Sequence, residues 1–182
     1  MNDHRQSFRN QFLVALPSLE EDYFSNTISL LVDHNAEGAF GLMINHPLDI
    51  EPGELIPALD GRFTCQVFEG GPVEQNRLFF LHSCDQSYDD TLPVSEDICM
   101  TASSALIDDL ARGKSPERII ALLGYAGWGA EQLEDEIARD IWLLTPADAS
   151  IVFDAPIESR ASRAAQLLGV DLNLMGIRSG HD

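Results

Sequence analysis

The side chains best suited to moving a proton or binding a metal are the histidines, because imidazole titrates near neutral pH and is a common metal ligand. His34, His46 and His82 could converge in space, but they form no HxH or HExxH pattern that would require a metal site. Asn35 and Asn45 belong to the same stretch, and such amides more often satisfy turns and caps. The sequence therefore predicts no metal and no cofactor, and it leaves His34, Asn35, Asn45 and His82 as candidate binding residues.

Cysteine chemistry is a second possibility. His82 and Cys84 lie two residues apart, so they share a face if a strand continues through them, and an imidazole could lower the pKa of the thiol. A plain strand end is favoured, because no signature of a cysteine nucleophile and no GxSxG elbow occurs. Cys65, Cys84 and Cys99 are odd in number and form no CxxC pair. This pattern argues against a disulfide framework and a structural zinc, and it suits a reducing compartment.

Two glycine-rich segments could present backbone amides to a ligand. The first, residues 70–72, could form part of an oxyanion hole, but a rigid bend between two strands is favoured because Gly and Pro are the usual breaks. The second, residues 124–129, is expected to be a turn into a helix, where free N–H groups favour an anion. The candidate binding residues from these segments are Gly70, Gly71, Pro72, Gly124, Tyr125, Gly127 and Trp128.

The helix expected after the second segment argues against a phosphate site. Its first turns carry the carboxylates of Glu131, Glu134, Asp135 and Glu136. These groups already complement the helix dipole and would repel an anion. The segment also lacks the Lys and Ser/Thr of a P-loop and does not match GxGxxG. A structural turn is favoured over a cradle for a small ligand.

Short apolar runs and turn residues predict the elements that position these groups. Strands are expected at 12–16, 27–32, 39–45, 67–69, 77–83, 119–125 and 141–144, with a strand or an extended segment at 149–154. Helices are expected at 102–112, 130–139 and 159–168, the first capped by Thr101 and ended by Gly113. Residues 35–38 predict a hairpin turn between the second and third strands. This order indicates a mixed sheet flanked by helices.

The composition predicts one domain over residues 1–182, with residues 1–10 flexible and loops 49–61 and 84–97 the most mobile. Thirty Asp and Glu residues against eleven Lys and Arg give a net charge of −19, which opposes direct binding of nucleic acid or an anionic membrane. The first ten residues do not resemble a signal peptide, and no apolar run approaches the ~18 residues of a membrane span. We therefore expect a cytoplasmic protein.

Seven ordered blocks resemble the YqgE/AlgH family of bacterial proteins. They are FLVALPSL at 12–19, DHN..GAFGLMINHPL at 33–48, EGGPV at 69–73, FLHS at 80–83, ALLGYAGWGAEQLEDEI at 121–137, W.L.TPAD at 142–148 and Gly180-His181. The resemblance implies an α+β fold with a coiled mixed sheet, and most members have no established activity. One branch is linked by name to regulation of alginate production, which implies a regulatory role.

Two positions depart from the family pattern. A Cys often precedes the Glu-His-Asn triplet of the family, but Val32 stands there in this sequence, followed by Asp33-His34-Asn35. Thiol chemistry at that position cannot operate in this protein. The usual Asn-x-Trp of the family is here Asp140-Ile141-Trp142, which would turn an amide contact into a carboxylate contact.

The leading prediction is a non-enzymatic binding or regulatory module that acts through a protein partner or small molecule, with indirect transcriptional regulation as one form of this role. It would use a polar edge formed by residues 33–47, 70–72 and 124–128, since no full set of nucleophile, base and orienting group can be assembled. The alternative is a hydrolase in which His34 or His82 is the general base and the amides of residues 70–71 stabilise an oxyanion. A purely structural interaction protein or homo-oligomer is the third possibility.

Overall fold

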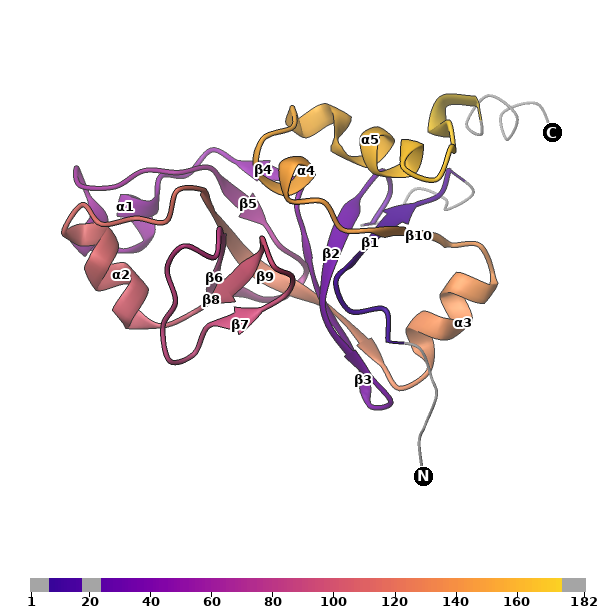
Figure 1. The fold of residues 1–182 in the computed structure, drawn as a ribbon, viewed down its shortest axis with the longest axis horizontal. Helices are drawn as coiled ribbons and strands as arrows, with labels where there is room; N and C mark the ends of the chain where they lie inside the picture. The colour runs from indigo at the N-terminus through magenta and orange to yellow at the C-terminus, as the bar shows by residue number, and fades with distance from the viewer. Residues whose placement is uncertain (1–6, 18–23, 175–182) are drawn as a thin grey trace.

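The fold is a strongly curved sheet with helices on its outer faces (Figure 1). The computed structural model describes residues 7–17 and 24–174. The strands are β1 (Gln11–Ala15), β2 (Ile28–Asn35), β3 (Gly38–Met43), β4 (Pro47–Leu48), β5 (Val67–Glu69), β6 (Val73–His82), β7 (Leu92–Pro93), β8 (Cys99–Thr101), β9 (Ile119–Gly129) and β10 (Trp142–Pro146). The helices are α1 (Pro52–Leu55), α2 (Ser104–Ala111), α3 (Gln132–Ala138), α4 (Ala149–Phe153) and α5 (Arg160–Gln166), with 3-10 turns η1 (Pro57–Leu59) and η2 (Ile157–Ser159).

The sheet is mixed, as predicted. Its main strand order is β10-β1-β2-β3-β9-β6-β8-β7, with β4 and β5 off this path. The β5–β9 pair is parallel and the other pairs are antiparallel. The predicted strands from 12–16 to 141–144 each fall on an observed strand, and the three predicted helices fall on α2, α3 and α5. The α+β class with a coiled mixed sheet is confirmed.

Strand β9 joins the two halves of the sheet. Its first part pairs with β5 through Ala121–Leu123 and with β6 on its other edge, and its last part pairs with β3 through Ala126–Gly129. Figure 1 shows β9 running from the lobe of β5, β6, β7 and β8 to the lobe that contains β3. Three apolar clusters fill the interior, and α2, α3 and α4 each contribute buried residues to a different one.

The predicted hairpin is formed by β2 and β3. Asn35 pairs with Gly38 across a two-residue connection, and the Asn35 side-chain oxygen accepts a hydrogen bond of 2.7 Å from the Glu37 N–H. Gly38 has φ of +144°, which an L side chain rarely adopts. A Cβ at this position would also lie 2.2 Å from the Trp128 carbonyl oxygen. The turn chemistry and the close approach to β9 therefore both require glycine here.

The prediction of a turn at residues 124–129 is wrong, because these residues are the second half of β9. The glycines permit two backbones to cross at close range. A Cβ on Gly71 would lie 2.0 Å from the Tyr125 carbonyl carbon, and one on Gly124 would lie 2.5 Å from the Gly71 oxygen. Gly124 also has φ of +75°, and the β6–β9 register shifts between Val73 and Leu78. Glycine at these positions marks a bulge and a close backbone approach rather than a turn.

Two further expectations are corrected. Residues 149–154 form α4 rather than a strand or an extended segment, because the Asp148 side chain caps the Ser150 N–H and Ile151 and Val152 are buried on one side of the helix. A short β-branched run does not distinguish the two states. Thr101 lies in β8, so the N-cap position of α2 is Ser103, whereas Gly113 follows the helix at φ of +80°, as expected.

The remaining sequence expectations concern loops and ends. Residues 49–61 contain α1, whose capping box joins Glu51 and Glu54, and residues 84–97 contain β7. Residues 7–10 hydrogen-bond to β2, while residues 1–6, 18–19 and Gly180-His181 lie outside the described residues. Within the described ranges, no helix is long and apolar enough to cross a membrane.

We expect Gly71→Ala to lower the free energy of unfolding by about 3 kcal/mol or more, because the new methyl group would overlap the backbone of residue 125. Gly127→Ala is the matched control in the same segment: its methyl group would meet only the Tyr125 ring edge at 3.5 Å, so the change should stay below about 1 kcal/mol. Urea unfolding of both variants measures the difference. Equal, small effects would contradict the close crossing.

Candidate functional site

The tip of the β2–β3 hairpin separates its side chains by strand alternation. Asp33 and Asn35 are exposed, whereas His34 between them is buried. Asp33 lies opposite Phe40 on β3, so these two residues share the outer face of the hairpin. The sequence order Asp-His-Asn therefore places the polar groups outside and the imidazole inside.

His34 has both ring nitrogens engaged. Its Nδ1 accepts a hydrogen bond of 2.9 Å from the Phe8 N–H, so the ring proton sits on Nε2, which faces Glu134 Oε1 at 3.2 Å. The Phe8 ring also stacks on the imidazole, with centroids 4.8 Å apart. The His34 side chain is only 5% exposed. It joins the chain start, β2 and α3, and it has no lone pair free to act as a base.

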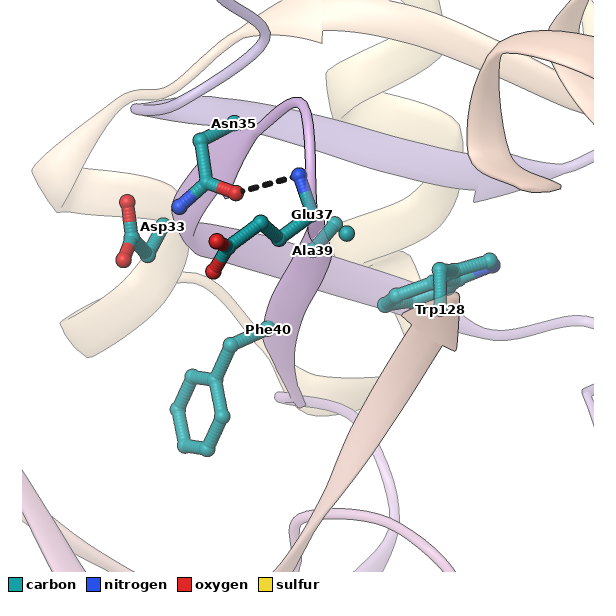
Figure 2. A pocket seen from close by; sticks show the side chains of 7 residues that line it. Asp33, Asn35, Glu37, Ala39, Phe40 and Trp128 are labelled. Atoms are coloured by element: carbon teal, nitrogen blue, oxygen red, sulfur yellow. Dashed lines mark hydrogen bonds between the residues drawn. The ribbon is translucent and has the colours of Figure 1, made fainter. Parts of the chain in front are cut away.

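A pocket of about 240 Å³ opens on the outer face of this hairpin (Figure 2). Figure 2 shows the carboxyl groups of Asp33 and Glu37 and the amide of Asn35 beside the hairpin turn, with the Phe40 ring below them and the Trp128 ring on the other side of β3. Two carboxylates, an amide and the Phe40 ring therefore border one small space, whereas the Trp128 ring, opposite Ala39 in the register, lies on the other face of the sheet. This combination suits a cationic group, which carboxylates attract and aromatic faces accept.

The Trp128 indole is held in place by the carboxylate of Glu136, which also binds the Trp142 indole. Glu136 Oε1 accepts hydrogen bonds from the indole N–H groups of Trp128 and Trp142, each at 2.9 Å. Gln132 donates to the other oxygen of Glu136 at 3.2 Å. Both indoles are nearly buried, so the carboxylate satisfies two donors that would otherwise lack a partner. The sequence interpretation of the tryptophans as core residues is consistent with this arrangement.

Residues 70–72 form the crossing with β9. The Gly70 N–H donates to the Leu123 carbonyl at 2.6 Å, and the Gly70 carbonyl accepts from the Met43 N–H at 2.8 Å. The Gly70 amide is thus engaged in the sheet and is not available to an oxyanion. Gly71 packs directly against residues 125 and 126 of β9. The favoured interpretation of these residues as a bend between two strands, β5 and β6, agrees with the structure.

His82 lies in a separate, fully buried network. Its Nδ1–H donates to the Ser83 carbonyl at 2.8 Å, so Nε2 accepts from the Thr101 hydroxyl, also at 2.8 Å. The chain continues through Thr91 Oγ1 to the Tyr88 N–H, each step at 2.8 Å. Burial lowers the pKa of His82, although the bond to the Ser83 carbonyl opposes the shift. This histidine is a structural hydrogen-bonding group.

The structure does not bring the predicted site residues together. His82 pairs with Ile119 at one end of β9. His34 pairs with Ala39 on β3, and Ala39 pairs in turn with Trp128 at the other end of β9. Nine residues of strand, from 119 to 128, separate these two positions by about 30 Å. Asn45 lies elsewhere, where it accepts from the Ile28 N–H and donates to the Asn26 carbonyl. The groups that do meet at the hairpin tip are His34, Asn35, Gly127 and Trp128.

The expectation of free thiols at positions 84 and 99 is wrong, because a disulfide joins Cys84 and Cys99, whose Cα atoms are 5.6 Å apart. Position 99 lies on β8 directly opposite His82 on β6, so the sheet register brings position 84 within reach. Sequence spacing alone does not show this register. Cys65 is free, and burial raises the pKa of its thiol to about 12. Among the described residues, no group of three or more His, Cys, Asp or Glu side chains could hold a metal ion.

Sequence reasoning missed Phe8, Asp33, Glu37 and Glu134 as members of the hairpin site. Glu134 was considered only as a charge that complements a helix dipole. Its contact with His34 spans 100 residues of sequence, and no local pattern signals such a pairing. Asp33 and Glu37 could have been found from the alternation of the hairpin, which places Asp33, like Asn35, on the exposed face.

The fold and the site together define an α+β protein with a curved mixed sheet and a small polar pocket at a hairpin tip. A family model described as AlgH-like matches residues 12–173. UPF0301 proteins from Hahella chejuensis and Thioalkalivibrio sulfidiphilus are 40% and 41% identical, covering 100% and 96% of this chain and 100% and 97% of their own. The chain belongs to the AlgH-like family, and the resemblance seen in the sequence blocks is confirmed.

Solved structures agree with this assignment. The solution structure of the AlgH protein from Pseudomonas aeruginosa is similar with a TM-score of 0.78 and 37% identity, over 100% of both chains. A crystal structure of a protein from Corynebacterium diphtheriae has a TM-score of 0.79 over 97% of this chain and 94% of its own. At 21% identity, the second similarity supports the fold alone.

We expect thiol counting to show one accessible cysteine only after unfolding. In the folded chain Cys65 should react slowly near pH 8, because a pKa of about 12 leaves roughly 10⁻⁴ of it as thiolate. Unfolding without reductant should expose one thiol, and reduction should expose three. Cys65→Ala is the control and should give none before reduction. Three thiols in the unreduced, unfolded chain would contradict the Cys84–Cys99 bond.

Proposed function

We propose that the protein is a binding or regulatory module that recognises a cationic group of a partner at the tip of the β2–β3 hairpin. The single observation that supports this function is the pocket that Asp33, Asn35 and Glu37 line beside the Phe40 ring. The partner group has the chemistry of a lysine or arginine side chain. A regulatory effect then follows from occupancy of this site rather than from a reaction.

The charge of the chain supports a basic partner. At −19, the molecule attracts cationic surfaces and accelerates their encounter, while it repels the phosphates of nucleic acid. The exposed carboxylates at the hairpin tip would then contact the cationic group directly and make the binding specific. Phe40 is held for this role by stacking on Tyr125, with ring centroids 4.6 Å apart. A rigid aromatic wall loses little conformational freedom when a ligand binds.

The rival hydrolase lacks the geometry it needs. A general base must reach the proton that it removes, directly or through one water. His34 and His82 lie at opposite ends of β9, and each has its ring nitrogens in hydrogen bonds. The Gly70 amide, the proposed oxyanion donor, is bonded to Leu123. A binding function requires none of these groups to be free, so it is the better-supported proposal.

A cytoplasmic location remains part of the proposal. The Cys84–Cys99 disulfide bears on it, because structural disulfides persist mainly in oxidising compartments. In a reducing cytoplasm, the pair would be held as two thiols. The hairpin-tip site does not depend on this bond, since the pocket contains neither cysteine.

The test is a titration of the ¹⁵N-labelled protein with a lysine-rich peptide. We expect shifts of the Glu37 backbone N–H and the Asn35 side-chain amide, because both residues line the pocket. Asp33→Asn combined with Glu37→Gln should weaken binding by about three- to tenfold, since each exposed ion pair contributes little by itself.

The control removes the same charge elsewhere. Asp108→Asn combined with Glu96→Gln changes two exposed carboxylates that do not line the pocket. This variant should bind nearly as well as the unchanged protein. Equal weakening in both double variants would show that only the overall charge matters, and the hairpin-tip proposal would then fail. A stable dimer in sedimentation that covers the tip would favour the homo-oligomer instead.

A further inference from the structure

A second groove, unrelated to the hairpin tip, lies between the β5–β9 edge and the segment from α4 to α5. Its volume is about 500 Å³, within the range of small-molecule sites. Figure 1 shows α4 beside β4 and α5 above β1 and β2, at the end of the molecule away from the hairpin tip. Apolar side chains line much of the groove, among them Phe63, Ile119, Phe153 and Ile157. Two arginines, Arg118 and Arg160, line it as well.

Arg160 is the one buried Lys or Arg among the described residues, with 4% exposure. Its Nε donates to the Ala155 carbonyl at 3.1 Å and its Nη1 donates to the Ile44 carbonyl at 2.8 Å. Its guanidinium carbon lies 5.1 Å from the centre of the Phe68 ring. No carboxylate of the described chain forms an ion pair with it. A buried cation without a direct carboxylate partner is costly, and burial lowers the pKa of Arg160, although the negative charge of nearby Asp154 opposes the shift.

The guanidinium still has donors to offer. It carries five N–H groups, and only two of them are used in the hydrogen bonds to residues 155 and 44. The Nη2 nitrogen has no hydrogen-bond partner in the described chain, and solvent can reach it. These two facts place a donor of Arg160 where the groove can reach it. Such a planar fork matches a carboxylate in geometry and charge.

The other charges around the groove are few. Arg118 is half exposed, and its Nη2 contacts Asp154 at 3.2 Å. Glu117 is the one carboxylate among the lining residues. The net charge of −19 opposes an anion at long range, but exposed charges more than ~8 Å away are largely screened at physiological ionic strength. Locally, the carboxylates of Glu117 and Asp154 face two guanidinium groups, and of these two only that of Arg160 lacks an ion pair within the described chain.

We propose that this groove binds a small organic carboxylate, with its carboxylate oxygens on the N–H groups of Arg160 and its apolar body against Phe153 and Ile157. Arg118 at the rim adds a second positive charge. The ligand supplies the direct ion-pair partner that the buried guanidinium lacks. This inference goes beyond the hairpin-tip function and does not depend on it.

The experiment titrates the ¹⁵N-labelled full chain with sodium octanoate, neutral octanamide and inorganic phosphate. We expect octanoate to bind in the low-millimolar range, as a ligand of its size allows, and to shift the amides of Gln66, Ile119 and Ile157. Octanamide should bind at least about tenfold more weakly, because it lacks the charge. Phosphate should bind weakly or not at all, since it has no apolar body.

Arg118→Gln should weaken octanoate binding about two- to fivefold, and Arg112→Gln, the same change at an exposed residue outside the groove, should leave it unchanged. Arg160→Lys keeps the charge but not the fork and should weaken binding further. If that variant fails to fold, the octanamide comparison and the Arg118→Gln and Arg112→Gln pair decide the question. Four outcomes would each overturn the proposal: octanamide binds as tightly as octanoate, the shifts lie outside the groove, phosphate binds more tightly than octanoate, or octanoate binding does not saturate near 10 mM.

Discussion

The close crossing of residues 70–71 over residues 124–126 is the constraint on which the rest of the structure depends. At this point β9 changes neighbours, from β5 and β6 to β3, and the two halves of the sheet become one. The crossing brings backbone atoms so close that a single methyl group on Gly71 or Gly124 could not fit. Its hydrogen bonds, from Gly70 to Leu123 and from Met43 to Gly70, continue the sheet through the junction. Both candidate sites lie at places that this junction positions.

The polar groups that look catalytic in the sequence serve this architecture instead. His34 connects the chain start to α3 through the Phe8 N–H and Glu134, and His82 connects β6 to β8 through Thr101. A buried polar group costs free energy unless it is hydrogen-bonded, and each imidazole meets that need within the fold. Arg160 does so only in part, because two of its five N–H groups are bonded and no carboxylate of the described residues forms an ion pair with it. This difference separates a structural polar group from a candidate ligand site.

Much of the fold could be predicted from the sequence, and the errors have physical causes. Local signals located the strands and the Asn35–Gly38 turn, because hairpins are encoded by residues that are neighbours in the chain. The segment 124–129 was misread, since glycine marks a turn in most contexts and a close strand crossing in few. The run Ser150–Phe153 was misread because β-branched residues favour strands, whereas the Asp148 cap and burial against α5 select a helix. The Cys84–Cys99 bond depends on the β6–β8 register, which residue spacing does not contain.

The site was predicted less well than the fold for the same reason. His34, Asn35 and Trp128 were located, but the carboxylates that complete the pocket come from the alternation of β2 and the hairpin turn. The groove at Arg160 combines residues from three separate segments, between positions 63 and 160. No local motif marks such a site.

Amide hydrogen exchange across β9 tests the central claim most directly. If the strand passes continuously through the crossing, the amides of Gly70, Ala126 and Trp128 exchange as slowly as those of residues 120–122, through global unfolding. Fast exchange over residues 124–129, with slow exchange confined to 119–123, would mean that the segment is an open turn. The crossing would then not position either site, which would contradict the account.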